Sequence, residues 1–406
     1  MANHNLSKIV LAFSGGLDTS VSARWLAEKY DAEVITVTVD VGQQENLNQI
    51  AMRSKAIGVK SHYSIDARDE FATDYLSPAI KANAMYEGAY PLSTALSRPL
   101  ICSKLVEVAR KENASAVAHG CTGKGNDQVR FEVTAKSLAP DIRVLAPVRD
   151  WNMSRDEEIK YAKDNGIKVS EKKSIYSVDQ NMWGRSIECG PLEDPNVEPP
   201  EEVYEWTTSP EKSPQKPEYI SLEFMEGELV GLNSDTLKVR EIIERLNSIA
   251  GRHGVGRIDH IENRLVGIKS REVYECPAAV CILAAHKDLE KLVLTRHEAR
   301  FKKTIENRWA SLVYEGLWME PLRRDLDVFI ESTQKRVTGT VRLKLYKGIA
   351  TPIARTSPYS LYDFGMATYD ASSTFDQTLA KGFIELWGLP TTIASKLILK
   401  DDEEEK

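Results

Sequence analysis

Cysteine is scarce in this chain of 406 residues, and no pattern among the cysteines suggests a metal or disulfide site. None of the five belongs to a Cys-x-x-Cys pair, and the seven histidines never adopt the spacing of zinc ligands. The cysteines are Cys102, Cys121, Cys189, Cys276 and Cys281. We therefore expect reduced, mostly structural thiols.

Long apolar runs are also missing. No stretch approaches the roughly 18 residues that a membrane-spanning helix needs. Residues 1–8 are polar and lack the charged, apolar and small-residue zones of a signal peptide. These absences predict a cytoplasmic protein that neither spans a membrane nor is anchored to one.

Positive charge is not in excess either. The net charge of -7 offers no general attraction to nucleic acid phosphates, so we expect no nucleic acid partner. The acidic run at residues 401–405 is most simply a solvated tail, because like charges repel and do not pack.

The composition is that of a soluble globular protein, with 42% hydrophobic and 28% charged residues. The chain is long for one hydrophobic core, which favours two domains. In residues 1–170, short β-branched runs alternate with amphipathic helical patterns, which predicts an α/β nucleotide-binding domain with a parallel sheet covered on both faces. The expected strands are residues 8–13, 34–39, 62–65, 114–118 and 142–146, and the expected helices start near residue 17, near residue 47, at Phe71 (to Met85), at Pro99 (to Lys111) and after the capping box of Ser154 with Glu157.

The pattern changes beyond a proline-rich stretch at residues 191–217, which no regular element tolerates. Apolar residues alternate at positions 220, 222 and 224 and again at 341, 343 and 345, which predicts antiparallel strands, mixed with helices near 238–250 and 285–310. We expect an α+β substrate domain over residues 171–365. Residues 366–406 form a C-terminal segment with a helix around Gln377–Trp387.

The loop Ser14-Gly15-Gly16-Leu17-Asp18-Thr19-Ser20 lies between the first strand and the first helix. A phosphate group at such a position meets free backbone N–H groups and the positive end of the helix dipole. The hydroxyls add donors, and the carboxylate of Asp18 suits Mg²⁺, which takes one or two carboxylates together with phosphate oxygens. The plain alternative is a turn with an N-cap. The full string is more specific than that, and it resembles the PP-loop ATP pyrophosphatases, which cleave ATP between the α and β phosphates and form an adenylated intermediate.

A second glycine-rich loop follows the strand at 114–118 and continues into a longer string, residues 118–132. Ligands of open parallel sheets bind beyond the carboxyl ends of the strands, so both loops are expected to face one crevice. This string resembles the argininosuccinate synthase family, as do residues 90–99, 253–264 and 269–275. The resemblance covers about residues 8–365 and implies a ligase that joins citrulline to aspartate at the expense of ATP, with a homotetramer as the assembly.

The resemblance also implies the site residues. Catalytic roles are expected for Ser14, Asp18 and Asp127. The ATP contacts would be Ala12, Phe13, Ser14, Gly15, Gly16, Leu17, Asp18, Thr19, Ser20, Val39 and Gly120. Aspartate would meet Thr122, Asn126 and Asp127. Citrulline would meet Tyr90, Thr94, Asn126, Arg130, Ser177, Ser186, Glu262 and Tyr274, and Ala95 beside Thr94 is counted with the substrate-binding residues.

Several of these residues have a plainer interpretation. Family members often have serine where this chain has Ala95, which removes one hydroxyl from the substrate contacts. We interpret Cys121 as small loop packing and His119 as a packed side chain. For Glu262 the alternative is a surface ion pair with Arg264.

Two other functions compete with the ligase. An ammonia-using synthetase of the same superfamily would carry a glutaminase segment with an N-terminal cysteine nucleophile, and no such segment is present in this sequence. A nucleotide-sensing module would bind ATP without turnover. Release of AMP and pyrophosphate that depends on both amino acids would distinguish the ligase from either.

Overall fold

The computed structural model describes residues 6–151, 153–168 and 175–404, with side chains up to residue 399. These form two compact units, Met1–Tyr359 and Ser360–Lys406. The predicted domain boundary between residues 170 and 171 lies outside the described residues, and the division into three domains stays a prediction.

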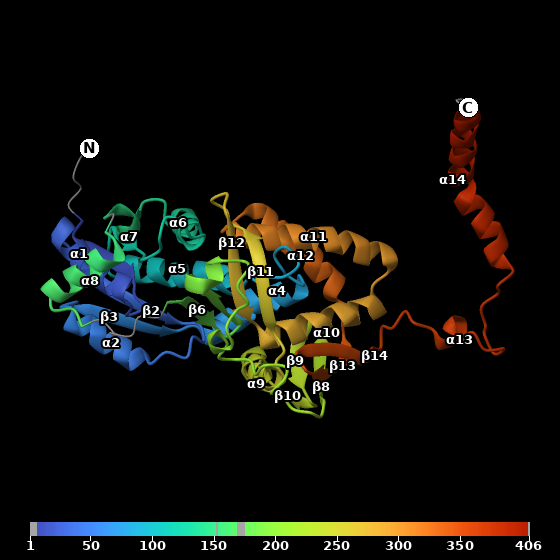
Figure 1. Ribbon diagram of the computed structural model, residues 1–406, viewed down its shortest axis with the longest axis horizontal. Helices are drawn as coiled ribbons and strands as arrows, with labels where there is room; N and C mark the ends of the chain where they lie inside the picture. The colour runs from blue at the N-terminus through green and yellow to red at the C-terminus, as the bar shows by residue number, and fades with distance from the viewer. Residues whose placement is uncertain (1–5, 152, 169–174, 405–406) are drawn as a thin grey trace. The chain divides into compact units, whose positions relative to one another are not determined.

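The first part of unit one contains a parallel sheet, as the alternating pattern predicted, and its strand order is β3-β2-β1-β4-β5. Its strands are β1 (Lys8–Ala12), β2 (Glu33–Asp40), β3 (Ser61–Asp66), β4 (Ala116–Ala118) and β5 (Arg143–Leu145). Strands β2 and β3 lie side by side in Figure 1, next to helix α2 (Leu47–Ala56). The chain leaves β1 toward β2 on one side, while β4 pairs with β1 on the other. The loops after β1 and β4 therefore flank the point where the strand order reverses, which is where open α/β sheets bind ligands.

Both faces of this sheet are covered. Val10 of β1 lies in a buried cluster with Leu100 of helix α5, whereas its neighbours Ile9 and Leu11 lie in another with Leu26 of α1. The longer helices are α1 (Leu17–Tyr30), α2 (Leu47–Ala56), α5 (Ser93–Lys111), α6 (Asp127–Leu138) and α8 (Arg155–Asp164). The shorter ones are α3 (Arg68–Glu70), α4 (Ser77–Lys81) and α7 (Pro147–Asp150). The predicted capping box of Ser154 with Glu157 is confirmed at the start of α8.

Two predicted helices of this part have different bounds. The helix expected over Phe71–Met85 is a π-helical turn, Phe71–Leu76, followed by α4, and it stops before Asn83, which is left-handed at φ +45°. The helix expected to start at Pro99 begins six residues earlier, at Ser93. Proline is common in the first turn of a helix, but Pro99 lies in the interior of α5, so its position does not mark the start of this helix.

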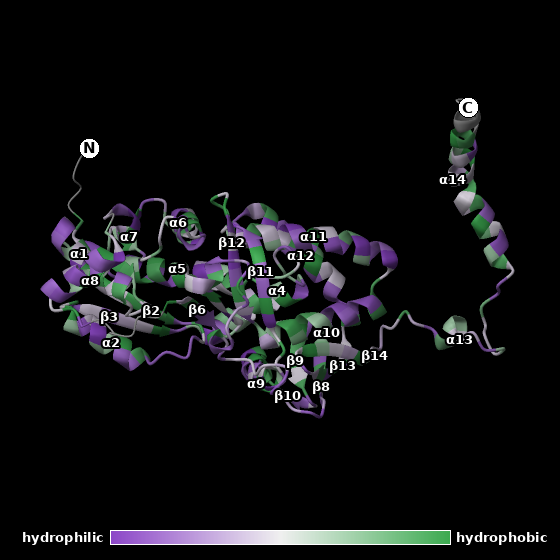
Figure 2. Ribbon diagram, viewed as in Figure 1, coloured by the Kyte–Doolittle hydropathy of each residue, from purple (hydrophilic) through white to green (hydrophobic). Residues whose placement is uncertain are grey.

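An antiparallel sheet in the order β10-β9-β8-β13-β14 follows later in the chain. Its strands are β8 (Glu218–Met225), β9 (Glu228–Leu232), β10 (Asp235–Thr236), β13 (Gly339–Tyr346) and β14 (Ile349–Thr356). The two predicted alternating runs are confirmed as antiparallel strands, and the structure pairs them with each other, with Leu222 opposite Val341 and Ile220 opposite Leu343. Hydrophobic residues are dense along α10, which lies over this sheet (Figure 2).

A further antiparallel sheet, in the order β11-β12-β7-β6, was not predicted. It consists of β6 (Ser177–Asn181), β7 (Gly184–Glu188), β11 (Arg257–Asn263) and β12 (Lys269–Glu275). Ser186 is paired with Tyr274 across β7 and β12. This sheet therefore brings together predicted citrulline contacts that are far apart in sequence.

The remaining helices of unit one are α9 (Val239–Arg252), α10 (Pro277–Val293), α11 (Arg296–Tyr314) and α12 (Pro321–Gln334). The prediction of a single helix near 285–310 is wrong, because α10 ends at Val293 and a separate helix, α11, begins at Arg296. Thr295 caps α11 in a capping box with Glu298, a signal that the apolar periodicity obscured. The proline-rich stretch forms only two short 3-10 turns, Gly190–Glu193 and Glu201–Val203.

Unit two contains α13 (Phe364–Ala367) and α14 (Leu379–Glu404). A helix was predicted here, but α14 is longer than expected. It exposes large apolar side chains, including Phe383, Trp387 and Ile393. Among the described residues, no helix has the length and apolar character to cross a membrane.

Candidate active site

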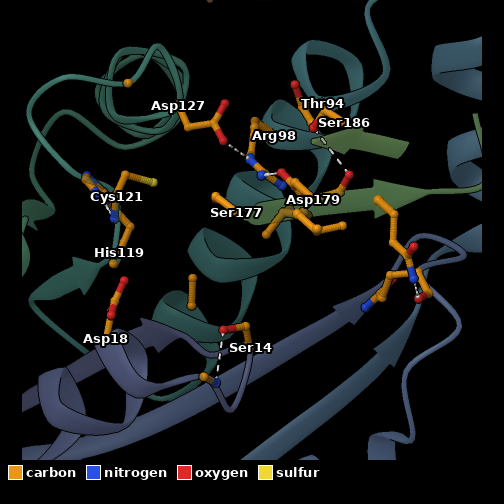
Figure 3. Close-up of a pocket in the computed structure, with 18 of the residues that line it drawn as sticks. Ser14, Asp18, Thr94, Arg98, His119, Cys121, Asp127, Ser177, Asp179 and Ser186 are labelled. Carbon is orange, nitrogen blue, oxygen red and sulfur yellow. Dashed lines mark hydrogen bonds and ion pairs between the residues drawn. The ribbon is translucent and has the colours of Figure 1, made fainter. Parts of the chain in front are cut away.

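A cavity of about 850 Å³ opens at the carboxyl edge of the parallel sheet and extends to the β6–β7–β12–β11 sheet. All but three of the predicted site residues line it. Those in the lining are Ala12, Phe13, Ser14, Gly16, Leu17, Asp18, Thr19, Val39, Tyr90, Thr94, Gly120, Thr122, Asn126, Asp127, Arg130, Ser177, Ser186, Glu262 and Tyr274. Gly15, Ser20 and Ala95 lie outside it. Ser14 and Asp18 are at one end, whereas Thr94 and Ser186 are at the other (Figure 3).

The first end of the cavity is the Ser14–Ser20 loop. Gly15 has φ +74°, a conformation that favours glycine, and Gly16 is the N-cap of α1 without any side-chain cap. The first N–H groups of α1 are therefore left for a ligand. Ser14 Oγ accepts a hydrogen bond from Gly16 N at 3.3 Å and lies 3.2 Å from Thr19 Oγ1, so both hydroxyls belong to the loop surface. An anion such as a phosphate group suits this arrangement.

Asp18 belongs to the same loop and forms an ion pair with Arg155, whose Nη1 lies 2.5 Å from Asp18 Oδ1. The neighbouring Glu158 is buried, and burial together with the Asp18 charge raises the pKa of Glu158 to about 7. Among the described residues, no group of three or more His, Cys, Asp or Glu side chains has the geometry for a metal ion. The carboxylate of Asp18 in the phosphate loop is an oxygen donor of the kind that Mg²⁺ takes together with phosphate oxygens.

The two glycine-rich loops approach each other closely. A Cβ atom on Gly120 would lie 3.0 Å from Thr19 Cγ2, so any larger residue there would push the loops apart. On the sheet side, Phe13 and Val39 contribute apolar surface next to Ala12. Thr38 Oγ1 donates to the Phe13 carbonyl at 2.5 Å and holds the end of β1 against β2. This combination of apolar walls and a phosphate loop suits a nucleotide.

At the other end of the cavity, the lining includes charged side chains that already form ion pairs with one another. Asp127 accepts from Arg98 Nε at 2.8 Å and from Arg130 Nη1 at 2.9 Å. Burial alone would raise the pKa of Asp127, but the two arginines lower it to about 2, so the carboxylate stays ionised. Arg98 also pairs with Asp179 of β6, and the two carboxylates approach it from different elements (Figure 3).

Glu262 lies on β11 and is only 4% exposed. Its Oε2 accepts from the Tyr274 hydroxyl at 2.6 Å, and its Oε1 accepts from Tyr314 at 2.6 Å. The alternative of a surface ion pair with Arg264 is wrong, because Arg264 pairs with the carboxylates of Glu188 and Glu272.

The plainer interpretations of His119 and Cys121 agree with the structure. His119 is buried and stacks on Phe131 with ring centroids 5.4 Å apart. Its Nδ1 accepts from the Cys121 backbone N–H at 3.2 Å. Burial raises the pKa of the Cys121 thiol, which leaves it a poor nucleophile. Ala95 is 1% exposed and lies in the core cluster.

Sequence reasoning missed several residues of this site. Arg98 falls within the quoted string 90–99, where it is the single charged residue, and that charge was a usable signal. Asp179 lies two residues after Ser177 on β6, so the period of a strand puts both on one face. Glu188 and Glu272 give the same signal, because they lie two residues from Ser186 on β7 and from Tyr274 on β12. Tyr314, which lies behind the lining, reaches the site only through long-range packing and left no local signal.

The fold and the cavity define a class: a nucleotide-binding protein of the HUP type, with a parallel 3-2-1-4-5 sheet joined to an α+β part that completes the ligand cavity. Two family models match the chain, the arginosuccinate synthase N-terminal HUP domain over residues 8–168 and the arginosuccinate synthase C-terminal domain over residues 176–394. The chain belongs to the argininosuccinate synthase family.

Named relatives agree with this membership. The chain is 58% identical to argininosuccinate synthase of Pyrococcus furiosus over 96% of this chain and 95% of the relative. It is 57% identical to that of Rubrobacter xylanophilus over 94% of each chain. It is 52% identical to that of Dehalococcoides mccartyi over 98% of this chain and 99% of the relative.

Proposed function

We propose that this chain is a ligase that condenses L-citrulline with L-aspartate to form argininosuccinate, using ATP and releasing AMP and pyrophosphate, as a step of arginine biosynthesis. One observation carries the proposal. A single cavity has a phosphate loop with a free helix N-terminus at one end and paired, buried charges suited to two amino acids at the other. The relatives named above support the same activity.

The chemistry takes two steps. The ureido oxygen of citrulline attacks the α phosphorus of ATP, the bond from that phosphorus to the bridging oxygen breaks, and pyrophosphate leaves. The aspartate amine then attacks the ureido carbon of citrullyl-AMP, AMP departs with the former ureido oxygen, and the amine loses its proton. Both steps require charge neutralisation and alignment more than a strong base.

At the nucleotide end, Ser14, Thr19 and the N–H groups of α1 would bind the phosphates, with Gly15, Gly16, Leu17 and Ser20 shaping the loop. Asp18 would hold Mg²⁺, which supplies positive charge to the polyphosphate when bound. Ala12, Phe13, Val39 and Gly120 would form the remaining ATP contacts. Arg98 lies in the cavity lining between Asp127 and Asp179, and we assign it charge neutralisation near the reacting groups.

At the amino-acid end, aspartate would meet Thr122, Asn126 and Asp127. Its ammonium matches the ionised carboxylate of Asp127. The citrulline contacts would be Tyr90, Thr94, Asn126, Arg130, Ser177, Ser186, Glu262 and Tyr274. The guanidinium of Arg130 suits the citrulline carboxylate, and Glu262 suits an N–H-rich group.

We also propose a homotetramer in the cytoplasm, with the C-terminal segment that begins at residue 366 in contact with other copies. The support is the set of exposed apolar side chains on α14, such as Phe383 at 61% and Trp387 at 68% exposure. A partner surface is the usual reason for a helix of this kind. Sedimentation of the full chain beside a chain ending at Tyr359 tests this; an equal number of copies per particle would refute it.

A pyrophosphate-release assay with each amino acid omitted in turn tests the activity. We expect release only with ATP, citrulline and aspartate together, and AMP as the second product. ADP as the product would overturn the ligase. Binding of ATP with no release under any combination would instead support a nucleotide-sensing module.

A further inference from the structure

Tyr314 is the last residue of α11 and has no exposed surface. Its hydroxyl lies between two residues that we assign to substrate binding. It accepts from Asn126 Nδ2 at 2.8 Å and donates to Glu262 Oε1 at 2.6 Å. Tyr314 is not part of the cavity lining, so any effect on substrate must pass through the lining residues that it contacts.

The directions of these hydrogen bonds follow from one backbone group. The N–H of Leu265 only donates, and it lies 3.0 Å from Asn126 Oδ1, which fixes the orientation of the Asn126 amide. The amide nitrogen must then face Tyr314. Because the Tyr314 oxygen accepts there, its own proton goes to Glu262. The other Glu262 oxygen already accepts from Tyr274, so the carboxylate is held by two hydroxyls.

The backbone of Tyr314 holds a third predicted contact. Its carbonyl accepts from Arg130 Nε at 3.1 Å and from Arg130 Nη2 at 3.0 Å. Both partners of that carbonyl are therefore nitrogen atoms of one guanidinium, whose Nη1 remains directed at Asp127. Gly316 makes the approach possible, since it has φ +77° and a Cβ there would lie 3.0 Å from Arg130 Cα.

We infer that Tyr314 is a positioning residue for citrulline binding, because it fixes Asn126, Arg130 and Glu262 relative to one another before substrate arrives. This inference rests on the proposed substrate roles of those three residues. A group that orients side chains in advance lowers the ordering cost of binding. No local sequence signal indicates this role, since Tyr314 ends an apolar helical stripe and resembles a core residue.

The substitution Tyr314→Phe isolates the hydroxyl. The ring stacks on Tyr86 with centroids 3.5 Å apart and planes 3° apart, and phenylalanine keeps that contact as well as the backbone carbonyl. Tyr86→Phe is the matched control, because its hydroxyl donates to the Asn263 carbonyl at 2.9 Å and touches none of the three positioned residues. Steady-state kinetics are measured for each substrate, together with thermal unfolding.

We expect Tyr314→Phe to raise the KM for citrulline about tenfold or more, the usual effect of losing a hydrogen bond to a charged group. The KM for aspartate should rise less, through Asn126, and the KM for ATP should stay within about twofold, since no nucleotide contact is involved. Tyr86→Phe should leave all three values unchanged. A lower melting temperature with unchanged KM values would reduce Tyr314 to a structural residue and overturn the inference.

Glu262→Gln separates this inference from the proposed function. If Glu262→Gln raises the citrulline KM and Tyr314→Phe does not, the role of Tyr314 is wrong while the site assignment stands. If neither variant changes it, the assignment of Glu262 is wrong and the inference falls with it. Should Tyr314→Phe fail to fold, a fluorinated tyrosine at position 314 keeps the shape and strengthens the donor; an unchanged citrulline KM there would also overturn the proposal.

Discussion

At the phosphate end of the cavity, the groups that face the ligand come from one loop and the first turn of α1, whereas at the amino-acid end they come from several strands and helices. The phosphate end uses backbone N–H groups that have no partner in the protein. The amino-acid end uses side chains that are already hydrogen-bonded to one another, such as Asp127 with Arg98 and Glu262 with Tyr274. The comparison indicates that the phosphate end is a general anion site, while specificity depends on a prebuilt network.

Asp127→Asn should give the largest effect, because it removes the carboxylate between two arginines at the prebuilt end. Arg98 keeps its pair with Asp179, whereas the buried Arg130 loses its paired carboxylate. Breaking a buried ion pair by removing one partner costs about 3 kcal/mol or more in the free energy of unfolding. We expect kcat/KM for aspartate to fall by about 10³, with the aspartate KM rising more than the citrulline KM. Urea unfolding and steady-state kinetics measure both effects.

Asp141→Asn is the control for this variant. Asp141 also pairs with an arginine, Arg110, at 2.5 Å, but on the surface and away from the cavity. It should change neither stability nor kinetics appreciably. Equal changes in the KM values for both amino acids in Asp127→Asn would contradict the assignment of Asp127 to aspartate.

Asp18→Asn should cut activity without affecting the fold, in contrast to Asp127→Asn. Asp18 is partly exposed and its ion pair with Arg155 is at the surface, so its packing contribution is small. We expect a fall in kcat of about a hundredfold, with a shift toward higher Mg²⁺ in a metal titration, because the carboxylate ligand is lost. Asp31→Asn, at the other end of α1, is the control and should retain activity. Normal turnover in Asp18→Asn would refute the metal role.

Glu272→Gln tests whether a negative charge on Glu272, at the amino-acid end of the cavity, destabilises the folded protein. Glu272 is 6% exposed, and burial together with Glu188 and Glu262 raises its pKa to about 8 from 4.5, despite the contact with Arg264. Between these values the folded protein binds more protons than the unfolded chain, so stability should fall as the pH rises.

The glutamine variant has no proton to lose and keeps an oxygen for Arg264. Its free energy of unfolding should therefore depend less on pH over that interval, by up to about 1 kcal/mol per pH unit. Urea titrations at several pH values compare the slopes. Parallel curves for the two proteins would show that Glu272 is ionised throughout.

The two ends also differ in how much of them could be predicted from sequence. The phosphate loop is contiguous, and its Ser14-Gly15-Gly16 string follows an apolar strand, so local chemistry was enough to predict an anion site there. The parallel sheet and the existence of strands β8 and β13 could be predicted because each has its own apolar pattern, whereas the pairing of β8 with β13 was not predicted. Such patterns depend only on neighbouring residues.

The amino-acid end was predicted through family resemblance alone, because its contacts join distant segments. Tyr274 and Ser186 meet only when β12 pairs with β7, and Tyr314 reaches Glu262 only through the packing of α11. The helix expected over 285–310 ended before Tyr314, so the residue that orders this end was left outside the site. Long-range pairing of this kind leaves no local signal.

Ala95→Ser should have the smallest effect. It tests whether a residue just behind the cavity lining contributes to substrate binding or only to the core. Ala95 is 1% exposed in the core cluster and outside the cavity lining, although its neighbour Thr94 is in it. An added hydroxyl would be buried and must find a partner, which costs about 1 kcal/mol if it does not. We expect a slightly lower melting temperature and a citrulline KM within about twofold of the original, whereas Thr94→Ala should raise that KM more. A large fall in the citrulline KM in Ala95→Ser would mean that the prebuilt end extends one residue deeper into α5 than the cavity lining indicates.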